Sequence, residues 1–334
     1  MKDKTIPWDG KQITKPGMYS GIPLPTYHSP DICADLDPAT KKFKTASSVS
    51  SSMLRAINPD TGSPAHFFAM WPGNPNRVED DDEKRHFVVG RALHHLVLGE
   101  KFFAKVFVAQ PDTYEDDKTG EIKKWNGNAG VCKRWLETMR KAKRAPLTSK
   151  EIEAIKQMAF SLGNHPLVRN GILNGLIERS LFWKDKETGV WMKWRPDAIP
   201  TDSADFGELK MTRDIRYPAL VSTIRKLGYF MQAALGRVAC KEVLDMEMGE
   251  FRFIFAENVP PYCTADFRIE DEDIQRGERM NRACLRNFVA CFKSGHWPGP
   301  HDHSHGDARI GLGEDARRQI DARLQQEGLA DGQD

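Results

Sequence analysis

The sequence predicts a mixed α/β fold, in which helices precede and follow a group of antiparallel strands. Apolar residues recur at helical spacing over residues 84–98 and 220–235. They alternate at strand spacing over residues 177–183 and 251–255, and a turn at 185–189 separates two strands. The chain has 334 residues, of which 40% are hydrophobic, so it can build one large domain with elaborations around a buried core.

Three segments are expected along the chain. Residues 1–46 are rich in Pro, Gly, Tyr and Asp without clear periodicity, which predicts an irregular N-terminal arm. Residues 47–296 form the expected domain, and residues 297–334 are expected to be a charged, flexible, partly helical tail. Four histidines near this tail could bind a metal ion or could belong to a disordered His-rich segment: His296, His301, His303 and His305.

Short helices and a hairpin are expected before the strands. Ser50 to Ser52 can cap one helix, and a second short helix begins at Pro64. Residues 112–128 are typical of a hairpin or a mobile loop, while Thr148 to Glu151 match a capping box that opens a further helix. The last helix before the strands is expected over residues 167–173.

The helix expected over residues 84–98 contains unusual residues. Gly90 costs roughly 1 kcal/mol against alanine in a helix, so another part of the protein is expected to pack closely against it. His94 and His95 point about 100° apart, so at most one of them faces the same way as the apolar stripe.

Two long helices are expected after the strands. One runs through residues 215–235, and Tyr229 and Gln232 share a face of it because they lie three residues apart. The other covers residues 270–294, and Gly295 stands where a C-cap glycine belongs.

The candidate site lies in residues 191–214, which are expected to form a strand, a turn and a second strand. The turn contains Asp197, and the second strand ends with Glu208, Leu209 and Lys210. Two carboxylates supply the hard oxygen ligands that suit Mg²⁺ or Mn²⁺. A neighbouring lysine can orient or activate a water, or stabilise a developing phosphate charge. This pattern is typical of a metal-dependent phosphodiesterase.

The composition limits the kinds of partner and site. The net charge is only +2, so a DNA-binding surface would have to be local. The six cysteines contain no C-x-x-C and fit neither a zinc site nor a disulfide framework, so reduced thiols are expected. The N-terminus has no apolar secretory segment and no run is long enough to span a membrane, so a soluble, cytoplasmic protein is expected.

Five motifs, in order, resemble the RecE-type exodeoxyribonucleases of the PD-(D/E)XK nuclease superfamily, which are related to the RecB nuclease domain and lambda exonuclease. They lie within residues 46–295 and read SSVSSSMLRAI, GRALHHLVL, LFWKDKETGVWMKWRPDAI, GELKMT and GYFMQAALG. The resemblance implies a restriction-endonuclease-like core, in which a central mixed β-sheet is flanked by helices.

The resemblance also implies a set of metal ligands for Mg²⁺ or Mn²⁺. Asp197 and Glu208 match the two metal carboxylates, and His94 matches a histidine that helps to hold the metal. The backbone carbonyl of Leu209 would be a further ligand. Asp205 is a competing carboxylate, but only Glu208 stands two residues before the lysine, which favours Glu208.

The remaining implied roles concern catalysis and DNA. Lys210 matches the catalytic lysine, and Gln232, with Tyr229, matches a helix motif that supports the site or touches DNA. Glu178 is a candidate additional acidic residue. Phosphate contacts are expected from four arginines, each of which could instead lie on a solvated face: Arg195, Arg213, Arg216 and Arg225.

The implied activity is 5′ to 3′ digestion of one strand of linear double-stranded DNA from its ends. Such an exonuclease would leave a single-stranded tail for an annealing protein in phage or prophage recombination, in the cytoplasm of a bacterial host cell. Related enzymes form rings, so a homo-oligomer is expected. Two alternatives stay open: a non-catalytic DNA-binding or phage structural protein on the same fold, and a PD-(D/E)XK endonuclease.

Overall fold

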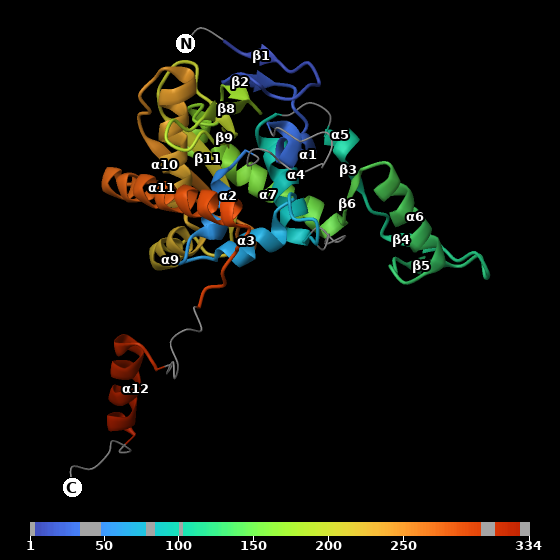
Figure 1. Cartoon of the computed structure of the whole chain (residues 1–334). Helices are drawn as coiled ribbons and strands as arrows, with labels where there is room; N and C mark the ends of the chain where they lie inside the picture. Colours follow the sequence, from blue (N-terminus) through green and yellow to red (C-terminus); the bar gives the residue numbers. More distant parts are fainter. Residues whose placement is uncertain (1–3, 34–47, 78–83, 100–102, 302–310, 328–334) are drawn as a thin grey trace.

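A computed structural model describes residues 4–33, 48–77, 84–99, 103–301 and 311–327 (Figure 1). Helices and short β-sheets alternate along these residues, so the predicted mixed α/β class is confirmed. A three-stranded mixed sheet lies at the centre. It consists of β11 (Phe206–Thr212), β12 (Phe251–Glu257) and β13 (Thr264–Arg268), with β11 parallel to β12 and β12 antiparallel to β13.

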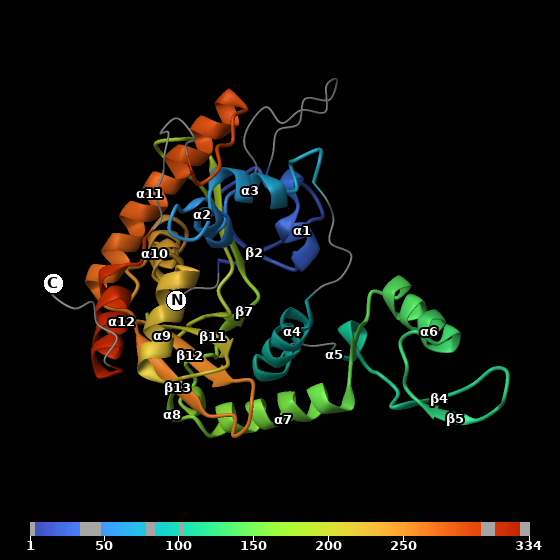
Figure 2. The same cartoon turned by 90° about the horizontal axis from the view of Figure 1, so that it is seen from below.

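Both faces of this central sheet are buried under helices (Figure 2). On one face, Phe251, Phe253 and Phe255 share a core with residues of α10 (Tyr229–Ala239) and α11 (Asp271–Ser294). On the other, Ile254 and Ala256 share a core with residues of α4 (Arg85–Val97) and α7 (Ser149–Asn164). The twofold alternation of strand side chains explains this division, and the prediction of a strand over residues 251–255 is confirmed.

Glycine lets α4 approach the central sheet closely. A Cβ atom built on Gly90 would lie 3.3 Å from the Cε atom of Met211 on β11. The close packing expected at Gly90 is therefore present, and it brings the histidines of α4 near the centre of the molecule.

A second sheet, ordered β1-β2-β8-β9, leads the chain to the candidate site. β8 (Ser180–Lys184) and β9 (Trp191–Trp194) form an antiparallel hairpin. After β9, the short strand β10 (Ala198–Ile199) pairs with β7 (Leu176–Ile177). Asp197 therefore lies in the connection between β9 and β10, each of which pairs with a different strand.

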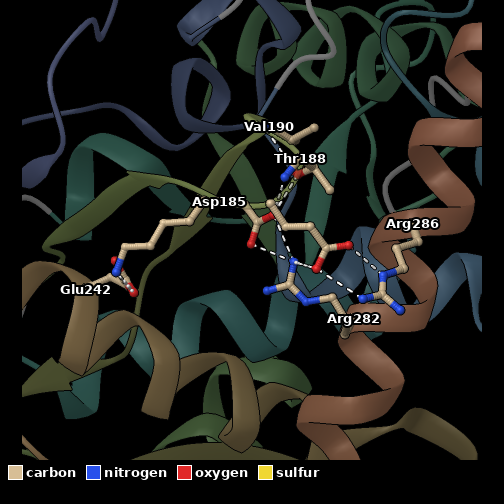
Figure 3. A network of polar contacts seen from close by, with 8 residues as sticks. Asp185, Thr188, Val190, Glu242, Arg282 and Arg286 are labelled. Atoms are coloured by element: carbon tan, nitrogen blue, oxygen red, sulfur yellow. Dashed lines mark hydrogen bonds and ion pairs between the residues drawn. The ribbon is translucent and has the colours of Figure 1, made fainter.

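The turn of the β8–β9 hairpin is held by a polar network (Figure 3). The Asp185 carboxylate accepts hydrogen bonds from the backbone N–H and hydroxyl of Thr188, at 2.9 and 2.8 Å. The Arg282 guanidinium on α11 donates to the same carboxylate at 2.8 Å, and Arg286 donates to Glu187 at 2.6 Å. These contacts join the closed end of the hairpin to the long helix α11.

The expected irregular N-terminal arm is corrected for residues 4–33. This segment forms β1 (Ile6–Pro7), β2 (Gly17–Ser20) and α1 (Leu24–His28), followed by a 3-10 turn, η1 (Pro30–Ile32). β2 pairs with β8, and Tyr19 and Tyr27 pack against Phe182 in a small core. The strands are only two and four residues long, too short for a visible periodic pattern. The domain limits at residues 46 and 296 stay predictions.

The helix expected through residues 215–235 is in fact two helices, α9 (Tyr217–Leu227) and α10. Gly228 separates them with a left-handed φ of 62°. The side chain of Arg55 packs against this break. A Cβ atom built on Gly228 would lie 3.1 Å from the Cγ and Cδ atoms of Arg55. Because α9 ends at this glycine, a second helix begins at Tyr229.

Two other predictions are wrong in detail. The strand expected over residues 177–183 is interrupted, because Glu178 adopts a left-handed φ of 59°. Residues 180–183 are all buried rather than alternating, since both faces of β8 are covered. The helix expected over 167–173 is the four-residue α8 (Pro166–Arg169).

The helices near the N-terminal side of the domain follow their predicted positions. They are α2 (Ser51–Ile57) and α3 (Pro64–Met70). Ser50 occupies the N-cap of α2 but makes no side-chain cap hydrogen bond. At α7, Thr148 and Glu151 form the predicted capping box, and Gly295 ends α11 in the left-handed conformation.

The middle part of residues 107–147 projects from the rest of the molecule (Figures 1 and 2), while Phe107 and Leu147 at its two ends lie in the core with residues of α4 and α7. Residues 107–147 follow α5 (Phe103–Val106) and contain five elements: β3 (Phe107–Ala109), β4 (Thr113–Glu115), β5 (Ile122–Lys124), α6 (Gly130–Lys141) and β6 (Ala145–Leu147). β4 and β5 form a hairpin, which is one of the two structures predicted for residues 112–128.

The C-terminal tail contains one further helix, α12 (Glu314–Gln326), which buries no residue and lies apart from the body in Figure 1. His303 and His305 lie outside the described residues. All six cysteines are free thiols. In the described part of the chain, every helix is too short or too polar to cross a membrane.

Candidate active site

The carboxylates and the lysine of the predicted motif lie together at the junction of β9, β10 and β11. Asp197 Oδ2 accepts a hydrogen bond of 2.7 Å from the backbone N–H of Leu209. Lys210 Nζ donates to Glu208 Oε1 at 2.6 Å. Glu208 and Lys210 point to the same face of β11 because strand side chains alternate. The tertiary fold thus joins a residue of the turn to the Glu-x-Lys segment.

Helix α4 contributes His94 to this group. The His94 Nδ1 atom lies 3.3 Å from Asp197 Oδ1. The ring of His95 instead meets Phe107 edge-on, with ring centroids 5.4 Å apart. The structure therefore brings only the first of the two neighbouring histidines to the carboxylates.

The first turn of α10 contributes Gln232 and Tyr229. Gln232 Nε2 donates to Glu208 Oε1 at 2.7 Å. The Tyr229 ring stacks on Phe253 at 5.1 Å, and Lys210 Nζ lies 5.3 Å from the centroid of the Tyr229 ring. Because α10 begins anew after Gly228, both side chains reach the sheet from the helix start.

Burial and neighbouring charges shift the pKa values of the two carboxyl groups in opposite directions. Burial raises the pKa of Glu208, and the nearby Asp197 carboxylate raises it further. Burial also acts to raise the pKa of Asp197, but His94, Lys210 and the Leu209 N–H outweigh it, so this pKa is lowered.

The pKa values of both basic groups of the site, His94 and Lys210, are raised. For Lys210, burial acts to lower the pKa, but the Glu208 and Asp197 carboxylates raise it above its ordinary value. For His94, burial likewise opposes protonation, and the Asp197 carboxylate raises the net pKa. Lys210 is therefore positively charged at neutral pH.

The donor atoms at this site fit a hard divalent cation. Glu208 Oε1 is engaged by Lys210 and Gln232, but its Oε2 atom is buried without a hydrogen-bond partner. An orphaned carboxylate oxygen beside a second carboxylate matches the oxygen preference of Mg²⁺ and Mn²⁺. Over the described ranges, no three His, Cys, Asp or Glu side chains already converge at metal-holding distances.

Asp205 and Glu178 belong to other contacts. The Asp205 carboxylate accepts a hydrogen bond of 2.8 Å from the backbone N–H of Glu250 and so ties the start of β11 to the start of β12. Glu178 is exposed and lies 3.4 Å from Arg195. The structure thus groups Glu208, and not Asp205, with Asp197 and Lys210.

A phosphate contact by Arg195 is contradicted by its surroundings. Its side chain is only 7% exposed, and it donates to Ser180 Oγ and to the carbonyl of Ile22, both at 2.7 Å. The other three predicted arginines are exposed: Arg213, Arg216 and Arg225. Arg216 is paired with Asp214 at 2.6 Å. Contacts of these three with DNA stay predictions.

Sequence reasoning missed Arg55 of α2. Its guanidinium lies 5.7 Å from the Tyr229 ring centroid, and its Nη1 atom donates to the carbonyl of Leu227 at 2.7 Å. Its Nε atom is buried without a hydrogen-bond partner. No spacing in the sequence connects residue 55 with residue 229, so only the fold could reveal this neighbour of Tyr229.

Comparison with known proteins agrees with this geometry. Residues 50–305 match the family described as "PDDEXK-like domain of unknown function (DUF3799)". The chain belongs to this family. The match includes each element that supplies the carboxylates, the lysine, His94 and Gln232, so the predicted PD-(D/E)XK core is confirmed. No curated protein matches the chain.

Two solved structures resemble this PDDEXK-like chain. One is a protein from Eubacterium rectale named "Putative exonuclease", with a TM-score of 0.51 and 12% identity, over 81% of this chain and 92% of that one. At this identity the likeness shows a shared fold. The other, named SSO0001, has a TM-score of 0.28 and 14% identity over 62% of this chain and 88% of that one, which is too low to support an argument.

Proposed function

We propose that this PDDEXK-like protein is a metal-dependent exodeoxyribonuclease of the RecE type. The observation that carries the proposal is the convergence of Asp197, Glu208 and Lys210 with His94 and Gln232. A scaffold that only bound DNA would have no need to group the buried Glu208 with a carboxylate and a lysine that are only 11% and 17% exposed, because desolvating such charges costs free energy. The name of the Eubacterium rectale protein supports an exonuclease in particular.

The carboxylates would hold Mg²⁺ or Mn²⁺. Asp197 and Glu208 would be its main ligands, with His94 and the carbonyl of Leu209 as additional ones. When bound, such an ion polarises a phosphate and lowers the pKa of a neighbouring water. Gln232 holds one oxygen of Glu208 in place, which leaves the other oxygen for the ion.

Lys210 would act as a proton-bearing donor. Its raised pKa keeps the ammonium group charged at neutral pH. A charged donor at this point can orient the attacking water and stabilise the charge that develops on the phosphate. The reaction is hydrolysis of a phosphodiester bond, in which the water supplies the oxygen that joins phosphorus and no bond to the protein forms.

Arg55 is a further candidate for holding a phosphate. Its guanidinium and Lys210 Nζ both lie beside the Tyr229 ring, at 5.7 and 5.3 Å from the ring centroid. Arg55→Gln should raise the KM for DNA about tenfold, since a charged hydrogen bond of this kind contributes about 1.5 kcal/mol or more. Unchanged DNA affinity in this variant would exclude the contact.

The deciding experiment uses end-labelled linear duplex DNA and closed circular duplex DNA with Mg²⁺. The wild type should degrade the linear DNA and leave the circle intact. Lys210→Ala and Asp197→Ala should each lose at least about 100-fold in rate. Cutting of the closed circle would indicate an endonuclease, and equal rates in the variants would overturn the site assignment.

The finer features of the proposal follow the RecE resemblance. They are 5′ to 3′ polarity, a ring-shaped homo-oligomer, an annealing-protein partner in phage recombination, and action in the bacterial cytoplasm. A label at the 5′ or the 3′ end distinguishes the polarities. A strict monomer in light scattering that still digested DNA processively would exclude the ring.

A further inference from the structure

The N-terminal segment packs against the strand that leads to Asp197. Residues 4–33 precede the part of the chain that matches the PDDEXK-like family, which begins at residue 50. They nevertheless supply two strands of the β1-β2-β8-β9 sheet and the aromatic residue Tyr27, which is buried. On β9, Lys193 Nζ donates to the carbonyl of Tyr27 at 2.7 Å.

Arg195 joins this segment to the site. Its guanidinium lies 4.6 Å from the centroid of the Tyr27 ring, and it donates to the carbonyl of Ile22 at 2.7 Å. Through Nε it also donates to Ser180 Oγ on β8 at 2.7 Å. Arg195 therefore fixes the open end of the β8–β9 hairpin to the N-terminal segment through contacts in three directions.

Only one residue separates this anchor from Asp197. That residue is Pro196, which is buried and whose ring restricts φ. On the far side, Ala198 and Ile199 are held by pairing with β7. Contacts therefore hold the backbone on both sides of Asp197, and the carboxylate can meet His94 and the Leu209 N–H together.

We propose that Arg195 is a positioning residue, through which the N-terminal segment holds Asp197 in the geometry that binds a divalent cation. The inference rests on the proposed function, because it treats Asp197 as a metal ligand. Arg195 itself touches neither the metal nor the substrate. Its effect is that of the outer contacts that orient metal ligands in other proteins.

The hairpin offers a matched control at its other end. Arg282 donates to the Asp185 carboxylate, which is 8% exposed, and so fixes the closed end of the same two strands to α11 (Figure 3). Arg282→Gln removes an ion pair from this other end of the hairpin without touching the turn that carries Asp197. A general loss of stability would appear in both variants.

The test measures Mn²⁺ binding by calorimetry on the full chain, in parallel with thermal unfolding. Arg195→Gln should weaken Mn²⁺ binding at least tenfold, because the backbone that carries Asp197 would lose its anchor on the N-terminal segment. Arg282→Gln should lower the Tm and leave Mn²⁺ affinity within about twofold of wild type. Tyr27→Leu, which keeps the Arg195 hydrogen bonds, should weaken Mn²⁺ binding about threefold.

Wild-type Mn²⁺ affinity in folded Arg195→Gln or folded Tyr27→Leu would overturn the proposal. Equal losses in Arg195→Gln and Arg282→Gln would also overturn it, because they would show a general structural effect. Failure of the proposed nuclease function would look different. In that case the wild type would bind Mn²⁺ with the predicted dependence on Arg195 and yet cleave no DNA.

Discussion

The surroundings of Glu208 distinguish it from the nearby carboxylate of Asp205. It is only 5% exposed, and its two carboxylate oxygens have different surroundings. One oxygen accepts from Lys210 and Gln232, and the other is buried without a partner. Asp205, three residues earlier, has the same charge but accepts from the backbone of Glu250. Position in the fold therefore separates a candidate metal ligand from a loop contact.

The pair Glu208→Gln and Asp205→Asn tests this separation at the residue scale. Glu208→Gln should lose at least about 100-fold in nuclease rate, because the charge that would hold the cation is removed. Asp205→Asn should keep the rate and lose about 1 kcal/mol of unfolding free energy with its weakened hydrogen bond. Urea unfolding and single-turnover cleavage give the two readouts. The reverse assignment would follow if Asp205→Asn were the inactive variant.

Lys193 makes the stability depend on pH. Burial lowers the pKa of this lysine to about 8, with a smaller contribution from Arg195. Between that value and the higher pKa of the unfolded chain, the unfolded state binds more protons, so this group's contribution to stability increases as the pH rises.

The stability of the wild type relative to Lys193→Met should accordingly increase by about 2 to 3 kcal/mol from pH 7 to pH 10. Urea unfolding at both pH values checks this difference. A difference that stayed constant with pH would contradict the shifted pKa of Lys193.

Among the secondary-structure elements, the break between α9 and α10 decides which side chains of α10 contact the central sheet. The apolar spacing of residues 220–235 is continuous across the break and therefore predicts a single helix. Gly228 ends α9 in a left-handed conformation, and the new helix starts with Tyr229 beside Phe253. Glycine at this position meets both needs, a positive φ and room for Arg55.

Gly228→Ala should therefore destabilise the protein by more than Gly295→Ala. Both glycines have positive φ, 62° and 70°, so each substitution carries about 1 kcal/mol of backbone cost. A Cβ on Gly295 would meet no atom within 4 Å, whereas on Gly228 it would press on Arg55. Thermal unfolding of the two variants measures the difference. Equal Tm losses would show that contact with Arg55 does not matter.

For the whole molecule, cation binding should increase stability. An ion that binds only the folded state at 100 times its Kd adds about 2.7 kcal/mol to the free energy of unfolding. Mn²⁺ should thus raise the Tm by several degrees, and EDTA should reverse the change. Asp197→Ala should show no such rise. The same rise in Asp197→Ala would place the ion elsewhere.

Local structural patterns can be predicted from the amino-acid sequence alone. Alternation predicts the strand with Phe251, Phe253 and Phe255, and the Glu-x-Lys spacing places Glu208 and Lys210 on one face of their strand. These predictions depend on neighbours within a few residues, so backbone geometry alone decides them. The mixed α/β class follows from the same patterns.

Which distant residues meet depends on the folded chain as a whole. His94 rather than His95 approaches Asp197, more than a hundred residues away, because α4 packs on β11 through Gly90. Arg195 lies inside the protein rather than on a DNA-facing surface because residues 4–33 cover it. Such placements arise from burial and hydrogen bonds between remote segments, and local spacing contains no information about those contacts.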